Sequence, residues 1–389
     1  MLAKALSLMG HQVIWWISDF EHRSKRYRHS AKNNKLLIEN NVVVNFVHCP
    51  SYHSNISCAR IKYERFFGKG FYLDAQNESA PDLIVLAEPS IFFSSHIKKY
   101  VQEKKCLLVV DILDLWPELF YVIFPIKIKW LADLFLLPIY RMRSALINSA
   151  DAVIGVTNDY VKAVLSSEAI FKPNFICYLG VDLKQYNKDL SSCDNHTVRE
   201  FARDSNLVVL YSGSFGNAYD LDTVISSIRD IVNLKKSVKF IFVGDGPKKE
   251  KIQELASLYK QEVLFLGVLS SKMLPSVYKY CDIGLCSYTY GSTVSMPVKA
   301  YDYFAAGLAI ISSLKREISE ILEHNQAGMT YIAGSSSSLR NCILLLLNNI
   351  KYLEIMKKNS KQLSLKFDSV DQHNKLARFL TSIPKINKN

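Results

Sequence analysis

The sequence predicts an α/β protein built from two successive doubly wound units, each with a parallel sheet covered by helices on both faces. Short, continuous, β-branched apolar runs alternate with helical stretches of about 10–15 residues. The alternation stops at a polar connector over residues 185–206 and then restarts. The chain has 389 residues, of which 49% are apolar, so each of two domains can bury a core of its own.

The first predicted domain spans residues 1–184. It begins with a helix over residues 2–9 that ends at Gly10. A strand buried on both faces reads as a continuous apolar run, which is typical of a parallel sheet. Such runs predict strands at residues 12–17, 42–47, 82–87, 106–112, 152–156 and 174–179.

The second predicted domain spans residues 207–364. Its predicted strands and helices alternate strictly, in the order strand 207–211, helix 221–232, strand 238–243, helix 247–259, strand 263–266, helix 270–280 and strand 283–287. Residues 365–389 are expected to form a C-terminal helix and a basic tail that crosses back to the first domain.

The stretch from Met296 to Ser312 is the most informative part of the chain. It predicts a helix over residues 297–306, stopped by Gly307, and then a strand over 308–311. Lys299 and Asp302 fall in its first turns, where free backbone N–H groups and the positive helix end attract anions. A cation with a carboxylate three residues later suits a diphosphate attached to a ribose.

Three glycine-containing loops follow the first strands of the second domain. They lie at residues 211–217 (YSGSFGN), at 243–247 (VGDGP) and at Gly267. Gly213 and Gly216 can bring backbone N–H groups close to a phosphate at the carboxyl end of a parallel strand. A glycine between strand and helix is usually only a turn residue, but three such loops in succession favour a phosphate site.

The net charge of +12 favours anionic partners, namely membrane phospholipid, phosphorylated substrates or nucleic acid. No nucleic-acid-binding motif is present, so we expect no nucleic acid. The eight cysteines show no CxxC pair and no metal-ligand spacing, which indicates reduced thiols in a cytosolic protein. We expect neither a signal peptide nor a helix that spans a membrane.

Acidic residues follow the predicted strand 106–112. Asp111, Asp114 and Glu118 lie beside Trp116 and Pro117, where they are expected either to serve as a base or substrate ligand, or to cap the next helix. Asp245 is interpreted first as a helix cap. The histidines at positions 11, 48 and 96 have no evident partner and are interpreted as core or surface residues.

Two stretches of the first domain suggest contact with an anionic membrane surface. Residues 22–35 contain six Lys or Arg. Residues 119–147 mix aromatic and aliphatic residues with Lys and Arg, as in a helix that lies in the headgroup plane, and Pro138 is expected to break them into two helices. The alternative is a buried hydrophobic hairpin together with a solvated loop.

The chain resembles the GT-B glycosyltransferases of the family 4 type, and most closely the bacterial subgroup that assembles O-antigen and capsule units on a lipid carrier. The resemblance covers nearly the whole chain. It is carried by DILDLWPELF (111–120), SADAVIGVT (149–157), YLGVD (178–182), LYSGSFGNAYDLDTVI (210–225), KFIFVGDGP (239–247), VLFLGVL (263–269), CDIGLCSY (281–288) and PVKAYDYFAAG (297–307).

The resemblance implies two Rossmann-like domains that face a cleft, and a retaining transfer of a hexose or N-acetylhexosamine from a nucleotide-diphosphate sugar to a polyprenyl-diphosphate-linked acceptor. It implies no cofactor and no obligatory metal, a cytoplasmic position on the inner face of the cell membrane, and no particular oligomeric state. Lys299 is the expected cation for the diphosphate, Asp302 the ligand of the ribose hydroxyls, and Asp114 and Glu118 the catalytic acids of the acceptor half. The remaining donor-binding positions are expected to be Gly213, Ser214, Gly216, Asn217, Gly244, Asp245, Gly246, Val268 and Pro297.

The sequence departs from the family pattern in three respects. The first helix follows Met1 directly, so we expect either that the start codon is misassigned or that the first strand of the family is missing. The paired glutamates of the family fall on Val294 and Asp302, and the loop GSFGNAYDLD contains no basic residue. Two alternatives therefore stay open: a non-catalytic GT-B protein that binds a glycan or a partner transferase, and a nucleotide-sugar 2-epimerase.

Overall fold

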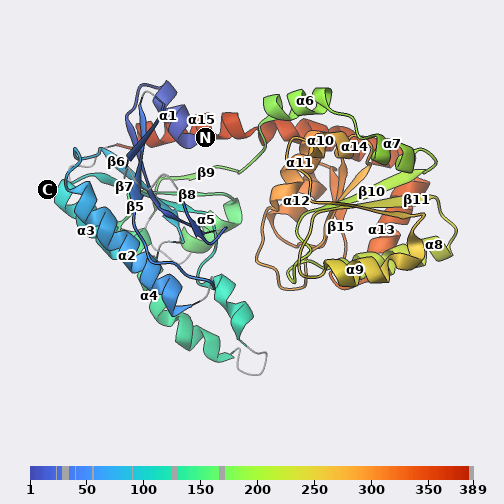
Figure 1. Ribbon diagram of the computed structural model, residues 1–389, viewed down its shortest axis with the longest axis horizontal. Coiled ribbons are helices and arrows are strands. Elements are labelled where there is room, and N and C mark those ends of the chain that lie inside the picture. Colours follow the sequence, from blue (N-terminus) through green and yellow to red (C-terminus); the bar gives the residue numbers. More distant parts are fainter. Residues whose placement is uncertain are drawn as a thin grey trace. The chain divides into compact units, whose positions relative to one another are not determined.

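The computed structural model describes residues 1–22, 24–28, 35–39, 41–54, 57–89, 91–124, 130–165 and 171–384 (Figure 1). The chain divides into two compact units. Unit 1 comprises Met1–Tyr178 and His373–Asn389, and unit 2 comprises Leu179–Gln372. Residues 185–206, expected as a connector, contain most of helix α6 (Leu183–Ser192) and all of α7 (His196–Ala202), both in unit 2.

Unit 2 contains one continuous six-stranded parallel sheet, in the order β12-β11-β10-β13-β14-β15. Five of these strands are short, mostly apolar runs at positions that the sequence predicts, whereas β15 was not expected. The strands are β10 (Leu207–Ser212), β11 (Val238–Val243), β12 (Val263–Gly267), β13 (Ile283–Cys286), β14 (Ala309–Ser312) and β15 (Gly328–Thr330).

Helices cover both faces of this sheet (Figure 1). One face carries α8 (Leu221–Asn233), α9 (Lys249–Leu255) and α13 (Ser336–Asn348). The other carries α10 (Leu274–Tyr278), α11 (Val298–Ala306) and α14 (Ile350–Lys366). Helix α12 (Glu317–His324) packs against β14 and β15.

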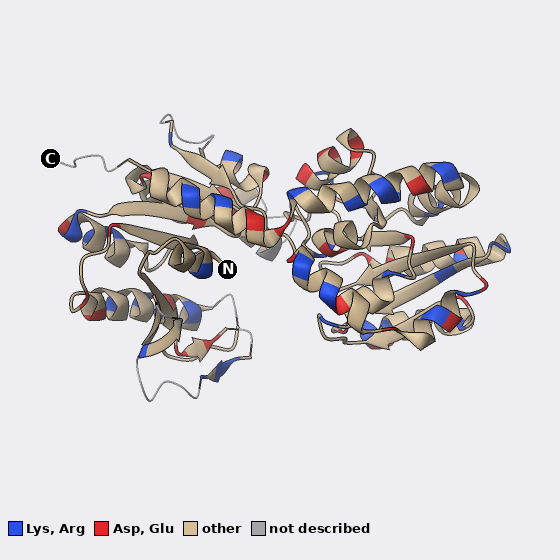
Figure 2. Ribbon diagram, turned by 90° about the horizontal axis from the view of Figure 1, so that it is seen from above, with Lys and Arg blue, Asp and Glu red and all other residues tan. Residues whose placement is uncertain are grey.

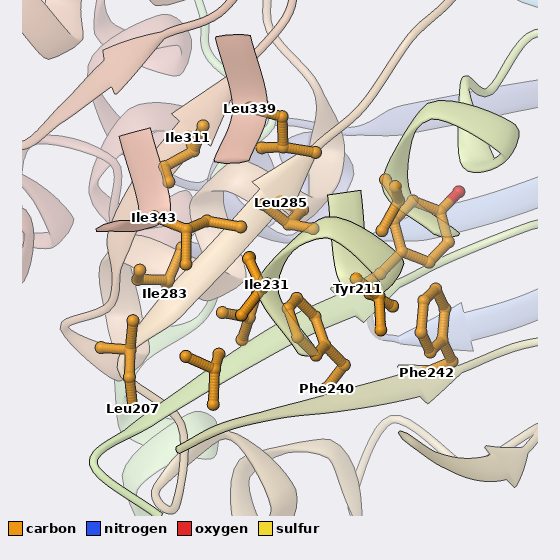
Figure 3. Packing of buried hydrophobic residues seen from close by; sticks show 14 of the residues in the cluster. Leu207, Tyr211, Ile231, Phe240, Phe242, Ile283, Leu285, Ile311, Leu339 and Ile343 are labelled. Atoms are coloured by element: carbon orange, nitrogen blue, oxygen red, sulfur yellow. The ribbon is translucent and has the colours of Figure 1, made fainter. Parts of the chain in front are cut away.

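The main core of unit 2 lies between the sheet and the face formed by α8 and α13. Figure 3 shows Ile231 of α8 and Ile343 of α13 packed over the side chains of β10, β11 and β13. Tyr211 and Phe242 lie at one end of this cluster, next to the carboxyl ends of β10 and β11 (Figure 3). The core therefore extends to the edge of the sheet from which the glycine loops leave.

Unit 1 holds two separate sheets. The first has the order β1-β5-β4, in which β1 and β5 are parallel and β4 is antiparallel. The second is fully parallel and has the order β6-β7-β8-β9. The strands are β1 (Val13–Ser18), β4 (Lys35–Glu39), β5 (Val42–Val47), β6 (Leu83–Glu88), β7 (Leu107–Ile112), β8 (Ala152–Gly155) and β9 (Asn174–Ile176).

The two sheets of unit 1 share one core although no strand joins them. Val47 of β5 and Leu86 of β6 belong to the same buried cluster, and Trp16 of β1 packs against it. Within the described residues, β1 pairs only with β5 and β6 pairs only with β7. Each of these two strands therefore has one edge without a neighbouring strand.

Helices complete unit 1. They are α1 (Leu2–Leu8), α2 (Cys58–Ala75), α3 (Ser94–Lys104), the 3-10 helix η2 (Glu118–Ile123), α4 (Ala132–Ser149), α5 (Asn158–Leu165) and α15 (Ser369–Ser382). Leu376 and Leu380 of α15 join the core on the second face of the β6–β9 sheet. A short hairpin, β2 (Phe20–Glu21) and β3 (Arg26–Tyr27), overlaps the start of the first basic stretch and was not expected.

Helix α4 corrects one expectation, because Pro138 lies inside it and does not divide it into two helices. A proline removes the hydrogen bond to the carbonyl four residues earlier. That carbonyl belongs to Leu134, whose side chain is exposed, so water can bond the freed oxygen. Packing of Leu136 and Leu146 into buried clusters on either side of the proline favours one helix over two.

Candidate functional site

The loops after β10 and β11 lie against each other through their backbones. The Gly213 N–H donates to the Val243 carbonyl at 2.9 Å, and the Phe215 N–H donates to the Asp245 carbonyl at 2.9 Å. The Gly244 N–H donates to the carbonyl of Gly267 at 2.7 Å. All three glycine-containing loops of the sequence are thus joined at one edge of the unit 2 sheet.

This packing explains the glycines and corrects part of their expected role. A Cβ atom on Gly244 would lie 1.9 Å from the Gly213 carbonyl oxygen, and one on Gly246 would lie 2.7 Å from the Phe215 nitrogen. The backbones approach too closely for any side chain. Because the N–H groups of Gly213 and Gly244 already bond to protein carbonyls, they are not the phosphate ligands that the sequence suggested.

Lys299 is the second residue of α11, and its side chain extends under the Gly213 loop. The residue is only 9% exposed. Its Nζ lies 3.9 Å from the ring centroid of Tyr211, 4.7 Å from that of Tyr219 and 5.7 Å from that of Tyr288. We call these three residues the tyrosine cage. The rings stabilise the ammonium through their quadrupoles but accept no strong hydrogen bond from it.

Within the part of the chain that the structure describes, Lys299 Nζ has no hydrogen-bond partner. Burial lowers the pKa of this lysine to about 8. A Cβ atom on Gly213 would lie 2.7 Å from Nζ, so a glycine is required where the loop passes over the ammonium. The arrangement is that of a buried cation without a counter-ion.

Asp302 lies one turn further along α11. Burial raises the pKa of its carboxyl group to about 6. Burial raises the pKa values of Tyr186 and Tyr278, and the nearby Asp302 carboxylate raises them further, which places it near α6 and α10. Pro297 is the N-cap residue of α11, and Gly307 ends the helix with a φ of 73°, as the sequence predicted.

The other predicted donor-binding residues lie around the same edge of the sheet. Ser214 and Asn217 are exposed, Gly216 is partly buried, and Val268 is exposed directly after β12. Asp245 does not cap α9, because its carboxylate accepts the N–H of Gly246 at 2.7 Å and pairs with Lys249 at 3.1 Å. Helix α9 begins after Lys248, without a side-chain cap.

The three candidate acidic residues of unit 1 lie at the end of β7 and after it: Asp111 is the penultimate residue of the strand, and Asp114 and Glu118 follow it. Burial raises the pKa of Asp111 to about 6, and partial burial also raises that of Asp114. Both oxygens of Glu118 accept hydrogen bonds from Nη1 of Arg143, at 2.7 and 2.9 Å. Pro117 is the N-cap position of η2 and has no side-chain bond, so neither acid has the capping role that was the alternative.

The tyrosine cage is the part of the site that the sequence did not indicate. Tyr211 ends β10, Tyr219 precedes α8, and Tyr288 follows β13, so the three rings come from separate parts of the chain. The only signal in the sequence is an aromatic residue at or beyond the end of two strands, in LYSG and CSYT.

Charge alone does not single out a membrane-binding element among the described residues. Lys and Arg occur beside Asp and Glu on helices of both units (Figure 2). Among the described residues, no helix is both long and apolar enough to cross a membrane. Residues 23, 29–34 and 125–129 of the two stretches expected at a membrane lie outside the described residues.

Comparison with known proteins identifies the kind of protein that this chain resembles. Residues 194–363 match the family described as glycosyl transferases group 1. The chitobiosyldiphosphodolichol beta-mannosyltransferase of Kluyveromyces lactis is 28% identical over 144 residues, which are 34% of this chain and 32% of the relative. The chain thus spans about a third of that relative's length.

Two solved structures have the same fold over most of their length. Sucrose-phosphate synthase from Thermosynechococcus elongatus has a TM-score of 0.73 at 15% identity, covering 98% of this chain and 92% of that one. HepE from Anabaena, in complex with UDP, has a TM-score of 0.65 at 16% identity, covering 87% of this chain and 86% of that one. The chain has the GT-B fold.

Proposed function

We propose that this protein is a retaining glycosyltransferase of the family 4 type. It moves a hexose or an N-acetylhexosamine from a nucleotide-diphosphate sugar to a lipid-linked glycan in the synthesis of bacterial O-antigen or capsule. The observation that carries the proposal is the ammonium group of Lys299, which is buried in the tyrosine cage without a hydrogen-bond partner among the described residues.

A buried ammonium without a counter-ion destabilises the folded protein, and its lowered pKa reports that cost. An anion that enters beside the Gly213 loop removes the cost by pairing with Lys299. Negative charge develops on the diphosphate as the glycosidic bond of the donor breaks. A preorganised cation at that point stabilises the transition state more than the ground state, which is how electrostatic catalysis accelerates a reaction.

The rest of the donor is assigned to the same edge of unit 2. Asp302 accepts hydrogen bonds from the ribose hydroxyls, and the start of α11 at Pro297 faces the phosphates. The other proposed donor-binding residues are Ser214, Gly216 and Asn217 of the first loop and Gly244, Asp245 and Gly246 of the second. Val268, exposed after β12, contacts the base. With Lys299 as the charge on the diphosphate, the proposal needs no obligatory metal.

The acceptor is assigned to unit 1. The Kluyveromyces relative is named for a diphosphate-linked lipid substrate, which supports a polyprenyl-diphosphate-linked acceptor here. Asp114 and Glu118 are the proposed acidic ligands of the acceptor sugar. Trp130 just before α4 and Leu134 and Phe135 in its first turn are exposed, which supports contact with a membrane surface. We propose that this surface is anionic and lies on the cytoplasmic side.

The proposal is tested by transfer assays with a panel of UDP- and GDP-sugars and extracted lipid-linked acceptors. We expect turnover with at least one donor and a loss of about 10²–10³ in kcat for Lys299→Met. Lys272→Met, which removes an exposed lysine, is the matched control and keeps full turnover. If no donor is hydrolysed or transferred while a nucleotide still binds, the protein is a non-catalytic GT-B protein.

A further inference from the structure

The strand order of the unit 2 sheet reverses between β10 and β13. The chain adds β11 and β12 on one side of β10, and then β13, β14 and β15 on the other. Ligands of open parallel sheets bind at this kind of switch point, where the loops of the two central strands leave in opposite directions. Lys299 and the tyrosine cage lie here, since Tyr211 ends β10 and Tyr288 follows β13.

The two central strands stop pairing with each other before they end. The ladder between β10 and β13 ends at the pair of Leu210 and Gly284. On its other side β10 pairs with β11 as far as Ser212, and β13 pairs with β14 as far as Cys286. The sheet therefore opens between β10 and β13 at its carboxyl edge, while both strands stay paired on their outer sides.

The hydroxyl group of Tyr303 bridges the two strands where their ladder is open. It accepts the N–H of Ser212 at 2.9 Å and donates to the carbonyl of Leu285 at 3.5 Å. A direct N–H···O=C bond spans about 2.9 Å, so an oxygen inserted between the two backbone groups holds the strands further apart. The ring of Tyr303 is fully buried, and a Cβ atom on Gly284 would overlap it, so β13 needs a glycine at this point.

A second tyrosine holds the same serine by its side chain. The hydroxyl of Tyr278, from α10, donates to Oγ of Ser212 at 2.8 Å. The rings of Tyr278 and Tyr303 meet edge to face, with centroids 5.8 Å apart. Burial raises the pKa of both phenols well above the usual range, so both remain protonated and can donate. Two buried hydroxyl groups thus fix Ser212, one at its N–H and the other at its Oγ.

Ser212 immediately precedes Gly213, the glycine that passes over Lys299. Lys299 and Tyr303 are four residues apart on α11, so their side chains lie on the same face of the helix, one turn apart. The Tyr303 hydroxyl holds the two strands apart, and Nζ of Lys299 extends to the Gly213 loop beside them. The position of this loop over the ammonium group therefore depends on the Tyr303 hydroxyl.

The plain alternative is that Tyr303 only fills the core and satisfies the end of a sheet. A phenylalanine ring would fill almost the same space, and direct pairing of β10 with β13 would satisfy the backbone groups without a hydroxyl. The hydroxyl is needed only where the two strands have to stay apart. That requirement arises at the switch point, where such sheets bind their ligands.

We propose that Tyr303 is a positioning residue for the donor diphosphate: its hydroxyl holds β10 and β13 apart and thereby keeps the Gly213 loop over Lys299, with Tyr278 in support. This inference rests on the proposed function, because it concerns the site assigned to the nucleotide sugar. Tyr303 does not touch the ligand, since it is fully buried. It acts on affinity through Lys299, which distinguishes it from a residue that only stabilises the fold.

The test uses the full chain and measures the affinity for UDP and GDP by titration calorimetry. Tyr303→Phe is expected to lower the affinity for the nucleotide that binds the wild type by about tenfold, because the strands can close and shift Gly213. In a Lys299→Met background the same change is expected to alter the affinity by less than about twofold, since the loop no longer confines an ammonium group. Tyr278→Phe is expected to lower the affinity of the otherwise wild-type protein about threefold.

Tyr100→Phe is the matched control. Tyr100 of α3 is also buried, and its hydroxyl donates to the carbonyl of Ala75 at 3.1 Å, within unit 1. Removing this hydroxyl is expected to lower the urea concentration at which unit 1 unfolds and to leave the nucleotide affinity unchanged.

The outcomes separate this inference from the proposed function. Wild-type affinity in Tyr303→Phe overturns the inference and leaves the proposed function standing. An equal loss with and without Lys299 also overturns it, because Tyr303 would then act on the fold and not through the lysine. If Tyr303→Phe does not fold, unchanged affinity in Tyr278→Phe overturns the inference. A wild-type protein that binds neither nucleotide overturns the proposed donor site and this inference together.

Discussion

The sheets of the two units differ in continuity. In unit 2 the strand β10 has a hydrogen-bonded neighbour on each side, and six strands form one sheet. In unit 1, among the residues that the structure describes, the strands β1 and β6 each have one edge without a partner strand, and their two sheets share a buried core. Backbone hydrogen bonding thus organises the carboxyl edge of unit 2 more completely than that of unit 1.

The difference appears again in the two candidate sites. In unit 2 three loops are joined by backbone hydrogen bonds, and this rigid edge holds Lys299 buried without a partner among the described residues. In unit 1 the candidate acids are less enclosed, since Asp114 is only partly buried and Glu118 is paired with Arg143. A strained, buried cation needs a well-supported scaffold, whereas less enclosed polar groups that meet a large acceptor do not.

The largest expected effect comes from the crossing of the Gly213 loop over Lys299. In Gly213→Ala the new methyl group would lie 2.7 Å from Nζ, at a φ of 144° that side chains rarely adopt. We expect the affinity for the nucleotide sugar to fall by about a hundredfold, because the ammonium must move. Isothermal titration calorimetry with the nucleotide sugar measures this change in affinity.

Gly334→Ala is the matched control, since this glycine also has a positive φ (80°) but has space for a methyl group. It should cost about 1 kcal/mol of stability and leave the affinity unchanged. Equal affinities of Gly213→Ala and the wild type would show that the loop does not confine Lys299.

The next effect concerns stability at the centre and at the edge of a sheet. Val209 of β10 is 1% exposed, and Val209→Ala should cost about 2–3 kcal/mol. Ile14 of β1 is 37% exposed, and Ile14→Ala should cost less than about 1 kcal/mol. Urea unfolding measures the free energy of unfolding of both variants.

The two units can be followed separately in that experiment. All four tryptophans (positions 15, 16, 116 and 130) belong to unit 1, so their fluorescence reports its unfolding, while circular dichroism reports both units. We expect unit 1 to unfold at the lower urea concentration. If Ile14→Ala lowers the free energy of unfolding more than Val209→Ala does, Ile14 is buried in solution and the edge of β1 is not open.

A smaller effect is the pH dependence of donor affinity. Lys299 binds the diphosphate only when it is protonated, and its pKa is lowered to about 8 by burial. Affinity should therefore fall as pH rises above 8, by about tenfold per unit at its steepest. Asp302, whose pKa is raised to about 6, must ionise to bind the ribose, so affinity should also fall below pH 6.

The neighbouring groups do not obscure that profile. Burial raises the pKa of Tyr211 and Tyr288, and it raises that of Cys286 to about 12, so they stay neutral across the range. Titration calorimetry with a nucleotide sugar between pH 5 and pH 9.5 measures both the fall in affinity above pH 8 and the fall below pH 6. A flat profile through pH 8 would place the diphosphate away from Lys299.

The fold was predictable where local signals agree. The strands 42–47 and 238–243 were predicted to the residue, because a continuous apolar run in a buried parallel strand leaves little alternative. The α11 helix was also predicted to within one residue, because Pro297 and Gly307 mark its ends chemically. The β2–β3 hairpin was missed, because its strands are two residues long and polar.

The site was predictable only in part. Lys299 was found from its position in a helix start, but the tyrosine cage depends on contacts between residues 211, 219 and 288, which no local pattern shows. The glycines were found, yet their N–H groups were assigned to phosphate rather than to neighbouring carbonyls.

The most direct test of the account is a comparison of the wild type with Lys299→Met, in which nucleotide binding and thermal unfolding are measured together. The account predicts that the variant without ligand is more stable, by on the order of 1–3 kcal/mol, because a buried unpaired charge is replaced by an apolar side chain of similar length. It also predicts that UDP or GDP, which binds the wild type, loses at least tenfold in affinity for the variant. Unchanged nucleotide affinity together with a lower unfolding temperature would contradict the account and make Lys299 a structural residue.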